Sequence, residues 1–125
     1  MVANYAQTLK NTRMTAVITV LDGQSGNAKL VIFNAAYALV LATITLQKPS
    51  FSMSVGVLTM LGVPLSAVAA NNGTAALAQF QDSAGTWWVQ GLTIGTSGTD
   101  IILNSTSITS GQTVTVTSAT ITAAP

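Results

Sequence analysis

The chain has 125 residues, a formal net charge of +1 and only 6% charged residues, against roughly 25% in an average soluble protein. It contains no His, no Cys and no Glu, which excludes catalysis by a histidine base, thiolate metal sites and disulfide bonds. Hydrophobic residues at 49%, with abundant Thr and Val, are typical of one folded β-rich domain spanning residues 1–125, and not of a disordered chain.

The first expected element is an amphipathic helix in the N-terminal segment, residues 1–22. Its apolar stripe has the spacing i, i+3, i+4 and i+7 and consists of Met14, Val17, Ile18 and Leu21. Since the rest of the chain predicts strands, this stripe is expected to pack on a sheet or on a neighbouring molecule.

The ends of this helix are predicted from capping residues. The helix begins either at Thr12, as the N-cap, or nearer Asn4, which extends the stripe by Tyr5 and Leu9. At the other end Gly23 follows Asp22 and is expected to be a left-handed C-cap.

The remaining residues, 28–123, predict a β-sandwich. Lys29 to Phe33 is a short apolar run typical of a buried strand, and Tyr37 to Gln47 ends in strict alternation. In that alternation Leu41, Thr43, Thr45 and Gln47 share one face. Phe51 to Leu61 is predicted to be one further alternating strand, and Pro64 marks a corner or an edge.

Turn signals divide the second half of the chain into short strands. Asn71-Asn72-Gly73 and Asp82 to Gly85 predict turns, the second of them a hairpin. The strands expected around and after these turns are Ala75 to Gln81, Thr86 to Gln90, Leu92 to Ile94, Ile101 to Leu103 and Val114 to Ile121. This spacing favours a mainly β fold, an antiparallel β-sandwich of jelly-roll type preceded by one helix.

Two adjacent aromatic residues, Trp87 and Trp88, are the most informative pair in the chain. Successive residues on a strand point to opposite faces, so one ring is expected to enter the core while the other faces outward. An outward Trp suits an interface anchor or a stacking surface for a sugar. The alternative is that packed layers bury both rings.

The acidic residues predict no chemistry. Asp82 opens the expected hairpin and Asp100 follows a Gly-rich turn, where Asp side chains accept hydrogen bonds from nearby backbone N–H groups. No pattern of paired carboxylates, metal ligands or a phosphate loop is present. We therefore expect a protein that is not an enzyme, with no catalytic residue, cofactor or metal.

The scarcity of charge favours a surface that is covered in an assembly, although a Thr-coated neutral monomer is the alternative. The basic residues form no cluster beyond Lys10 and Arg13, so no nucleic-acid partner is expected. The best candidate for a membrane span, Met53 to Ala70, contains two Gly and a Pro, and its first half alternates like a strand, so no membrane partner is expected either.

Two segments carry a resemblance to a known family. Residues 81–122, QDSAGTWWVQGLTIGTSGTDIILNSTSITSGQTVTVTSATIT, resemble small virion proteins of tailed phages encoded among head-morphogenesis genes, and residues 4–33, NYAQTLKNTRMTAVITVLDGQSGNAKLVIF, are similar to the N-terminus of that family. The resemblance implies a cement or decoration protein on the capsid exterior, made in the host cytoplasm. The major capsid protein would be its partner.

These observations leave several hypotheses about function. In the first, the chain forms a dimer or trimer that stabilises the assembled shell, with Tyr5, Leu9 and the outward member of Trp87 and Trp88 in contact. In the second, it is a tail-fibre or tail-tip module that binds a host glycan through its Trp pair or through the Thr face of residues 113–117. A head–tail connector component is a third hypothesis.

Overall fold

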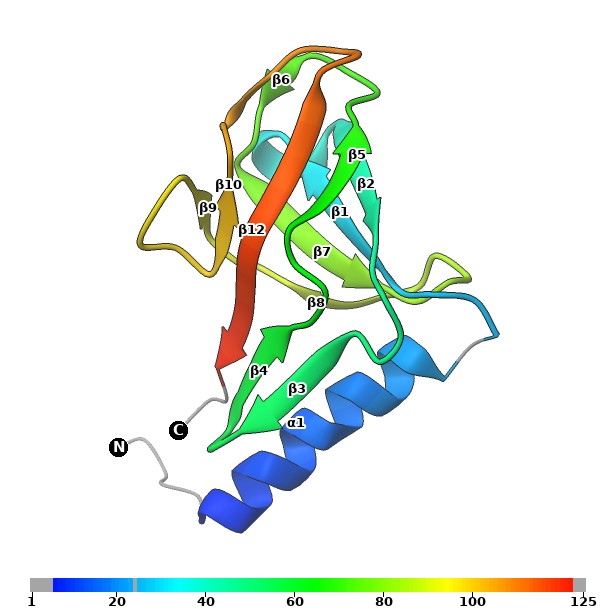
Figure 1. Cartoon of the computed structure of the whole chain (residues 1–125), viewed down its shortest axis with the longest axis vertical. Coiled ribbons are helices and arrows are strands. Elements are labelled where there is room, and N and C mark those ends of the chain that lie inside the picture. The colour runs from blue at the N-terminus through cyan, green and yellow to red at the C-terminus, as the bar shows by residue number, and fades with distance from the viewer. Residues whose placement is uncertain (1–5, 24, 123–125) are drawn as a thin grey trace.

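The chain folds into one helix followed by a set of mostly antiparallel sheets (Figure 1). The computed structural model describes residues 6–23 and 25–122. In chain order the elements are α1 (Gln7–Asp22), β1 (Lys29–Phe33), the 3-10 helix η1 (Ala35–Tyr37), β2 (Val40–Thr45), β3 (Phe51–Ser54), β4 (Val57–Met60), β5 (Leu65–Val68), β6 (Gly73–Thr74), β7 (Leu77–Gln81), β8 (Trp87–Gln90), β9 (Ile94–Gly95), β10 (Ile101–Leu103), β11 (Ser107–Ile108) and β12 (Thr113–Thr122).

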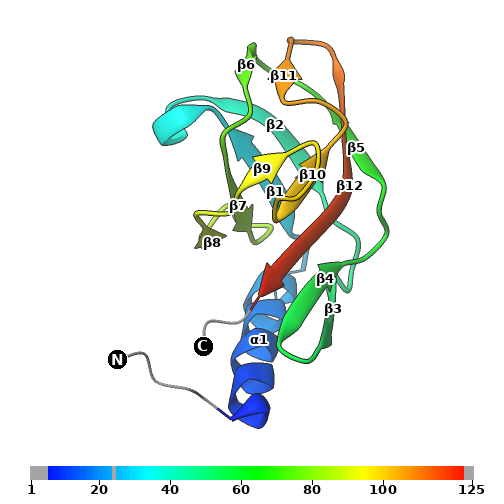
Figure 2. The same ribbon diagram turned by 90° about the vertical axis from the view of Figure 1, so that its left-hand side faces the viewer.

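Two larger sheets form the layers of the fold. The first has the strand order β2-β1-β7-β8, and the second has the order β3-β4-β12-β10-β9, with β5 also paired to β12. The pairs are antiparallel except β9–β10, which is parallel, and the short β6–β11 pair forms a separate ribbon. Seen from the side, the layers lie face to face (Figure 2). The predicted mainly β, sandwich-like fold behind one helix is confirmed.

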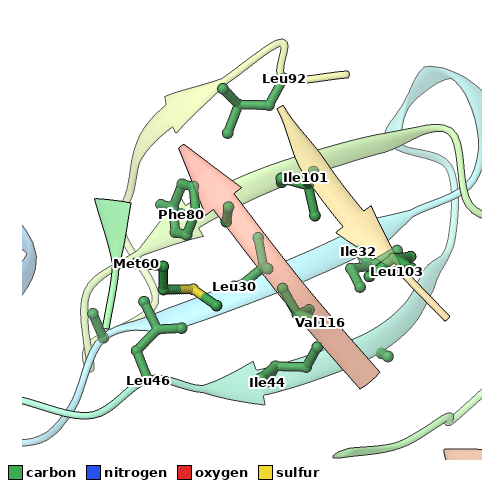
Figure 3. Close-up of a cluster of buried hydrophobic side chains, with 14 of the residues drawn as sticks. Leu30, Ile32, Ile44, Leu46, Met60, Phe80, Leu92, Ile101, Leu103 and Val116 are labelled. Carbon is green, nitrogen blue, oxygen red and sulfur yellow. The ribbon is translucent and has the colours of Figure 1, made fainter. Parts of the chain in front are cut away.

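The core lies between the two layers. Figure 3 shows Leu30, Ile32 and Phe80 of the first sheet facing the side chains of β10 and β12. Each of these three residues is fully buried. Phe80 also packs edge-on against Phe51, with ring centroids 5.0 Å apart. No helix among the described residues is long and apolar enough to cross a membrane.

The predicted stripe of α1 is confirmed. Met14 and Leu21 are buried, and Val17 and Ile18 pack against the core as partly buried residues. The helix contacts β3, β4 and β8, so the sheets supply the surface that its apolar side needs.

One of the two predicted starts of α1 and its predicted C-cap need correction. The helix begins at Gln7, which is nearer to the predicted start at Asn4 than to the one at Thr12. Thr12 lies inside the helix and donates its hydroxyl to the carbonyl of Thr8 (2.9 Å) instead of capping. Gly23 is right-handed, with φ −74° and ψ −13°, so the predicted left-handed C-cap is wrong. The chain leaves the helix without that turn, and the helix end is held by Asp22, whose Oδ2 accepts the backbone N–H of Ser50 at 3.0 Å.

A β-bulge changes the predicted face of Leu41. In the β1–β2 pair Ile32 lies opposite Ala42 and Phe33 lies opposite Val40, so Leu41 is the extra residue. A bulge interrupts the alternation of side chains. Leu41 is therefore buried, and does not share the exposed face of Thr43 and Thr45 as predicted.

The strand predicted from Phe51 to Leu61 is a hairpin. β3 and β4 pair antiparallel with Ser54 opposite Val57, and Val55-Gly56 forms the two-residue turn. Both turn residues have positive φ, 51° and 73°, which is the signature of a type I′ turn. Sequence patterning missed this turn because Val continues the apolar alternation and is a poor residue for positive φ.

Candidate interaction surface

The tryptophan pair lies on the β7–β8 hairpin, at the edge of the first sheet. Trp87 is 50% exposed and Trp88 is 47% exposed. Both sequence expectations, one ring in the core or both rings buried, are therefore wrong. The cause is a bulge: Phe80 lies opposite Val89 and Gln81 lies opposite Trp87, which leaves Trp88 as the extra residue. The bulge removes the alternation on which the prediction depended.

Asp82 holds this hairpin together, as its predicted turn role requires. The carboxylate is only 2% exposed, and its Oδ1 accepts the backbone N–H groups of Ala84 and Thr86, each at 3.0 Å. Its Oδ2 accepts the indole N–H of Trp88 at 3.1 Å. The bond from Trp88 and those from the turn backbone lower the pKa of Asp82, against the opposing effect of burial. A half-exposed ring is thus fixed in one orientation by a buried carboxylate.

A chain of amide side chains lies beside Trp87 on the same sheet face. Gln81 donates from Nε2 to Oε1 of Gln79 (3.0 Å), and Gln79 donates from Nε2 to Oε1 of Gln90 (3.0 Å). Gln79 and Gln90 are directly opposed across β7 and β8, as are Gln81 and Trp87. Opposed residues of antiparallel strands share a face. This face therefore carries a chain of ordered amides next to an exposed aromatic ring, and the outermost of them, Gln90, is exposed.

Tyr37 borders the same face at its far end. Its ring packs edge-on against Phe33, with centroids 5.2 Å apart, and its hydroxyl accepts the backbone N–H of Gly91 at 2.9 Å. Phe33 lies opposite Leu77 in β7, so η1 folds back onto the strand that carries Gln79. We call the set Trp87, Trp88, Gln81, Gln79 and Gln90 the hairpin face; both Trp side chains and Gln90 are exposed, Gln81 is partly exposed and Gln79 is buried. The sequence feature that could have predicted this face is the alternation of Gln79 and Gln81 within a predicted strand.

The other predicted contact residues lie elsewhere. Leu9 is 44% exposed on α1, about 140° around the helix from the buried Met14. Tyr5 lies outside the described residues. Trp87 and Trp88 are brought together on one hairpin, whereas Leu9 belongs to a different element.

The described residues contain no pocket and no group of three or more His, Cys, Asp or Glu that could hold a metal. Asp100 closes a turn: its Oδ2 accepts the backbone N–H (3.1 Å) and the hydroxyl (3.2 Å) of Thr93, and its own backbone N–H donates to that hydroxyl at 3.0 Å. Asp82 and Asp100 thus both carry structural hydrogen bonds.

The Thr face of β12 has the predicted sidedness. Val114 and Val116 are fully buried, whereas Thr113 and Thr117 are exposed. Thr115 is partly covered, and its hydroxyl shares a hydrogen bond of 3.0 Å with Ser66 of the paired strand β5. One residue of this face, Thr115, therefore forms a hydrogen bond within the chain.

No protein-family model, curated protein or solved structure matches this chain. The resemblance to phage virion proteins therefore stays a prediction, and any function must be argued from the surface itself.

Proposed function

We propose that the protein is a cement or decoration protein of a tailed-phage head, which binds the assembled shell of major capsid protein from outside as a small homo-oligomer. The observation that carries the proposal is the half-exposed pair Trp87 and Trp88, of which Trp88 is fixed by Asp82, in a chain with only 6% charged residues. Trp residues are enriched among the side chains that dominate binding at protein interfaces. The sequence resemblance supplies the proposed partner.

Such a protein acts by mass action and needs no chemistry. A partner that binds only the assembled shell stabilises the shell by RT ln(1 + [L]/Kd), about 2.7 kcal/mol when its concentration is 100 times Kd. Preorganisation strengthens binding because fewer side-chain rotamers are lost on association. The bond between Trp88 and Asp82 provides that preorganisation for one of the two rings.

Two measurements test this proposal. In purified particles the protein should be present in proportion to the shell protein, and a few copies per particle would contradict a cementing role. Shells assembled without the protein should bind it, and Trp87→Ala should weaken that binding about 10-fold or more. Val68→Ala is the matched control, because Val68 is 66% exposed on β5, outside the hairpin face. Equal binding of wild type and Trp87→Ala would exclude the hairpin face as the contact.

The amide chain favours a second candidate, a glycan-binding module. The exposed amide of Gln90, which Gln79 orients, lies on the sheet face that carries an exposed aromatic ring. Such an amide can hydrogen-bond sugar hydroxyls while the ring stacks on the sugar. Titration with host-surface oligosaccharides, followed by Trp fluorescence, should then show saturable binding that Gln90→Ala and Trp87→Ala both abolish. Binding to shells without any glycan response favours the cement role instead.

A further inference from the structure

The tip of the β3–β4 hairpin carries a residue that fits its backbone badly. The turn Val55-Gly56 needs positive φ at both positions, and Asn-Gly is the preferred sequence for such a turn. Val55 has φ 51°, which for a β-branched residue is a genuine outlier, since its branched Cβ crowds the backbone. Val at this position therefore destabilises the turn relative to Asn, the residue that such a turn prefers.

Contacts within the described part of the chain do not explain the choice of Val. Tyr37 also has a positive φ, 55°, but its ring packs on Phe33 and its hydroxyl accepts the N–H of Gly91. Val55 instead is 72% exposed, the highest value among the exposed large hydrophobic residues described. Strain that persists at an exposed apolar side chain is a signal of function, because neither packing nor backbone preference maintains it.

The tip is nevertheless held rigidly. The buried Gly56 donates its backbone N–H to Oδ1 of Asn11 in α1 at 2.8 Å, so the turn is tied to the helix. The exposed neighbours of Val55 on the hairpin, Ser52, Ser54 and Thr59, are uncharged. Figures 1 and 2 both show β3, β4 and α1 lying together at one end of the molecule. A single isopropyl group thus stands on a fixed hairpin tip whose exposed neighbours on β3 and β4 are uncharged, while the adjacent α1 carries Lys10 and Arg13.

We propose that Val55 is an anchor residue that inserts into an uncharged apolar pocket of the shell protein. This inference rests on the proposed function and adds a second contact to the hairpin face. An uncharged pocket is the complement of this hairpin tip, because a charged group facing Val55 and its Ser and Thr neighbours would lose its water and gain no ion pair from them. A rigid tip also loses little conformational freedom on binding.

Two substitutions separate the apolar group from the backbone strain. Val55→Asn removes both, so the melting temperature should rise by roughly 3–6 °C while binding to shells assembled without the protein weakens about 10-fold. Val55→Thr keeps the branched shape and the strain but replaces a methyl group with a hydroxyl. It should leave the melting temperature near that of wild type and still weaken binding. Val68→Thr, the same change at an exposed position on β5, should alter neither quantity.

The outcomes distinguish this inference from the proposed function. If wild-type protein does not bind the shells, the proposed function fails and the shell is excluded as the occupant. If wild type binds and both Val55 variants bind equally well, the anchor role alone is overturned. A dimer of the free protein in sedimentation that Val55→Asn dissociates would show that the pocket belongs to a second copy, which also overturns the assignment to the shell.

Discussion

The indole N–H of Trp88 donates a 3.1 Å hydrogen bond to Oδ2 of Asp82. The other oxygen of the same carboxylate accepts the backbone N–H groups of Ala84 and Thr86, which close the turn between β7 and β8. One nearly buried carboxylate therefore connects the backbone of the hairpin to an exposed aromatic ring. Its removal should destabilise the turn and release the ring.

Asp82→Asn is expected to lower the melting temperature by several degrees at pH 7. An Asn side chain has one acceptor oxygen in place of two, and its NH2 group would face N–H donors. Trp88→Phe is the matched control, because it removes one of the three donors and keeps the turn. Its melting temperature should lie between those of wild type and Asp82→Asn. Equal melting temperatures for wild type and Asp82→Asn would show that the carboxylate does not hold the turn.

The contribution of Asp82 is expected to depend on pH. Because hydrogen bonds lower the pKa of Asp82 in the folded protein below its ordinary value of 3.8, folding favours the ionised form. This stabilisation is complete above that ordinary value and is lost as the pH falls through the lower, folded-state pKa. The difference in unfolding free energy between wild type and Asp82→Asn should therefore shrink with acidification below about pH 4.

Urea titrations of wild type and Asp82→Asn between pH 2 and 7 measure this difference directly. Asp22 and Asp100 are present in both proteins, so their contributions cancel in the difference, and the sequence contains no Glu or His. A difference that stayed constant from pH 7 to pH 2 would contradict the assignment.

Asn11→Ala is expected to reduce the free energy of unfolding by about 1–2 kcal/mol, because it leaves the buried N–H of Gly56 without its acceptor. Hydrogen exchange at Gly56 should become faster. Thr12→Ala is the control on the same helix: its hydroxyl bonds only the Thr8 carbonyl at an exposed position, so stability should change by less than about 0.5 kcal/mol. Unchanged exchange at Gly56 in Asn11→Ala would argue against the tie between helix and hairpin.

Phe80→Ala is expected to cost about 3–5 kcal/mol, which is the range for a large cavity in a well-packed core. Phe80 is fully buried between the two sheets and contacts Phe51. Val68→Ala, on the exposed end of β5, should change stability by less than about 0.5 kcal/mol. Equilibrium urea unfolding compares the two variants, and a small loss for Phe80→Ala would mean that the layers repack around the vacancy.

Periodicity predicted the elements whose side chains alternate regularly. The stripe of Met14 and Leu21, the buried run of β1 and the two faces of β12 follow from spacing alone, because burial of one side sets the pattern. The hairpin at Asp82 was also predictable, since Asp and Gly at a turn have a local mechanism.

The predictions that were wrong concern places where one residue interrupts the regular alternation of side chains. Bulges at Leu41 and Trp88 turn side chains away from their expected faces, and a bulge has no strong local sequence signal. The turn at Val55 was not predicted because Val fits the alternating strand pattern, whereas its backbone has a positive φ that Val rarely adopts. These last two exceptions, Trp88 and Val55, lie at the surfaces for which we propose contacts, which fits the tendency of functional sites to break local rules.

The β3–β4 hairpin is tied to α1 at two places, through Asn11 to Gly56 and through Asp22 to Ser50, while β4 pairs with the C-terminal end of β12. The other end of β12 pairs with β5, and β10 pairs along its middle. A force applied at the hairpin tip would consequently be distributed over the helix and along the whole length of β12. Several hydrogen bonds would have to break together before the tip could detach, so the tip should resist a pull better than a hairpin held only by the pairing of its own two strands.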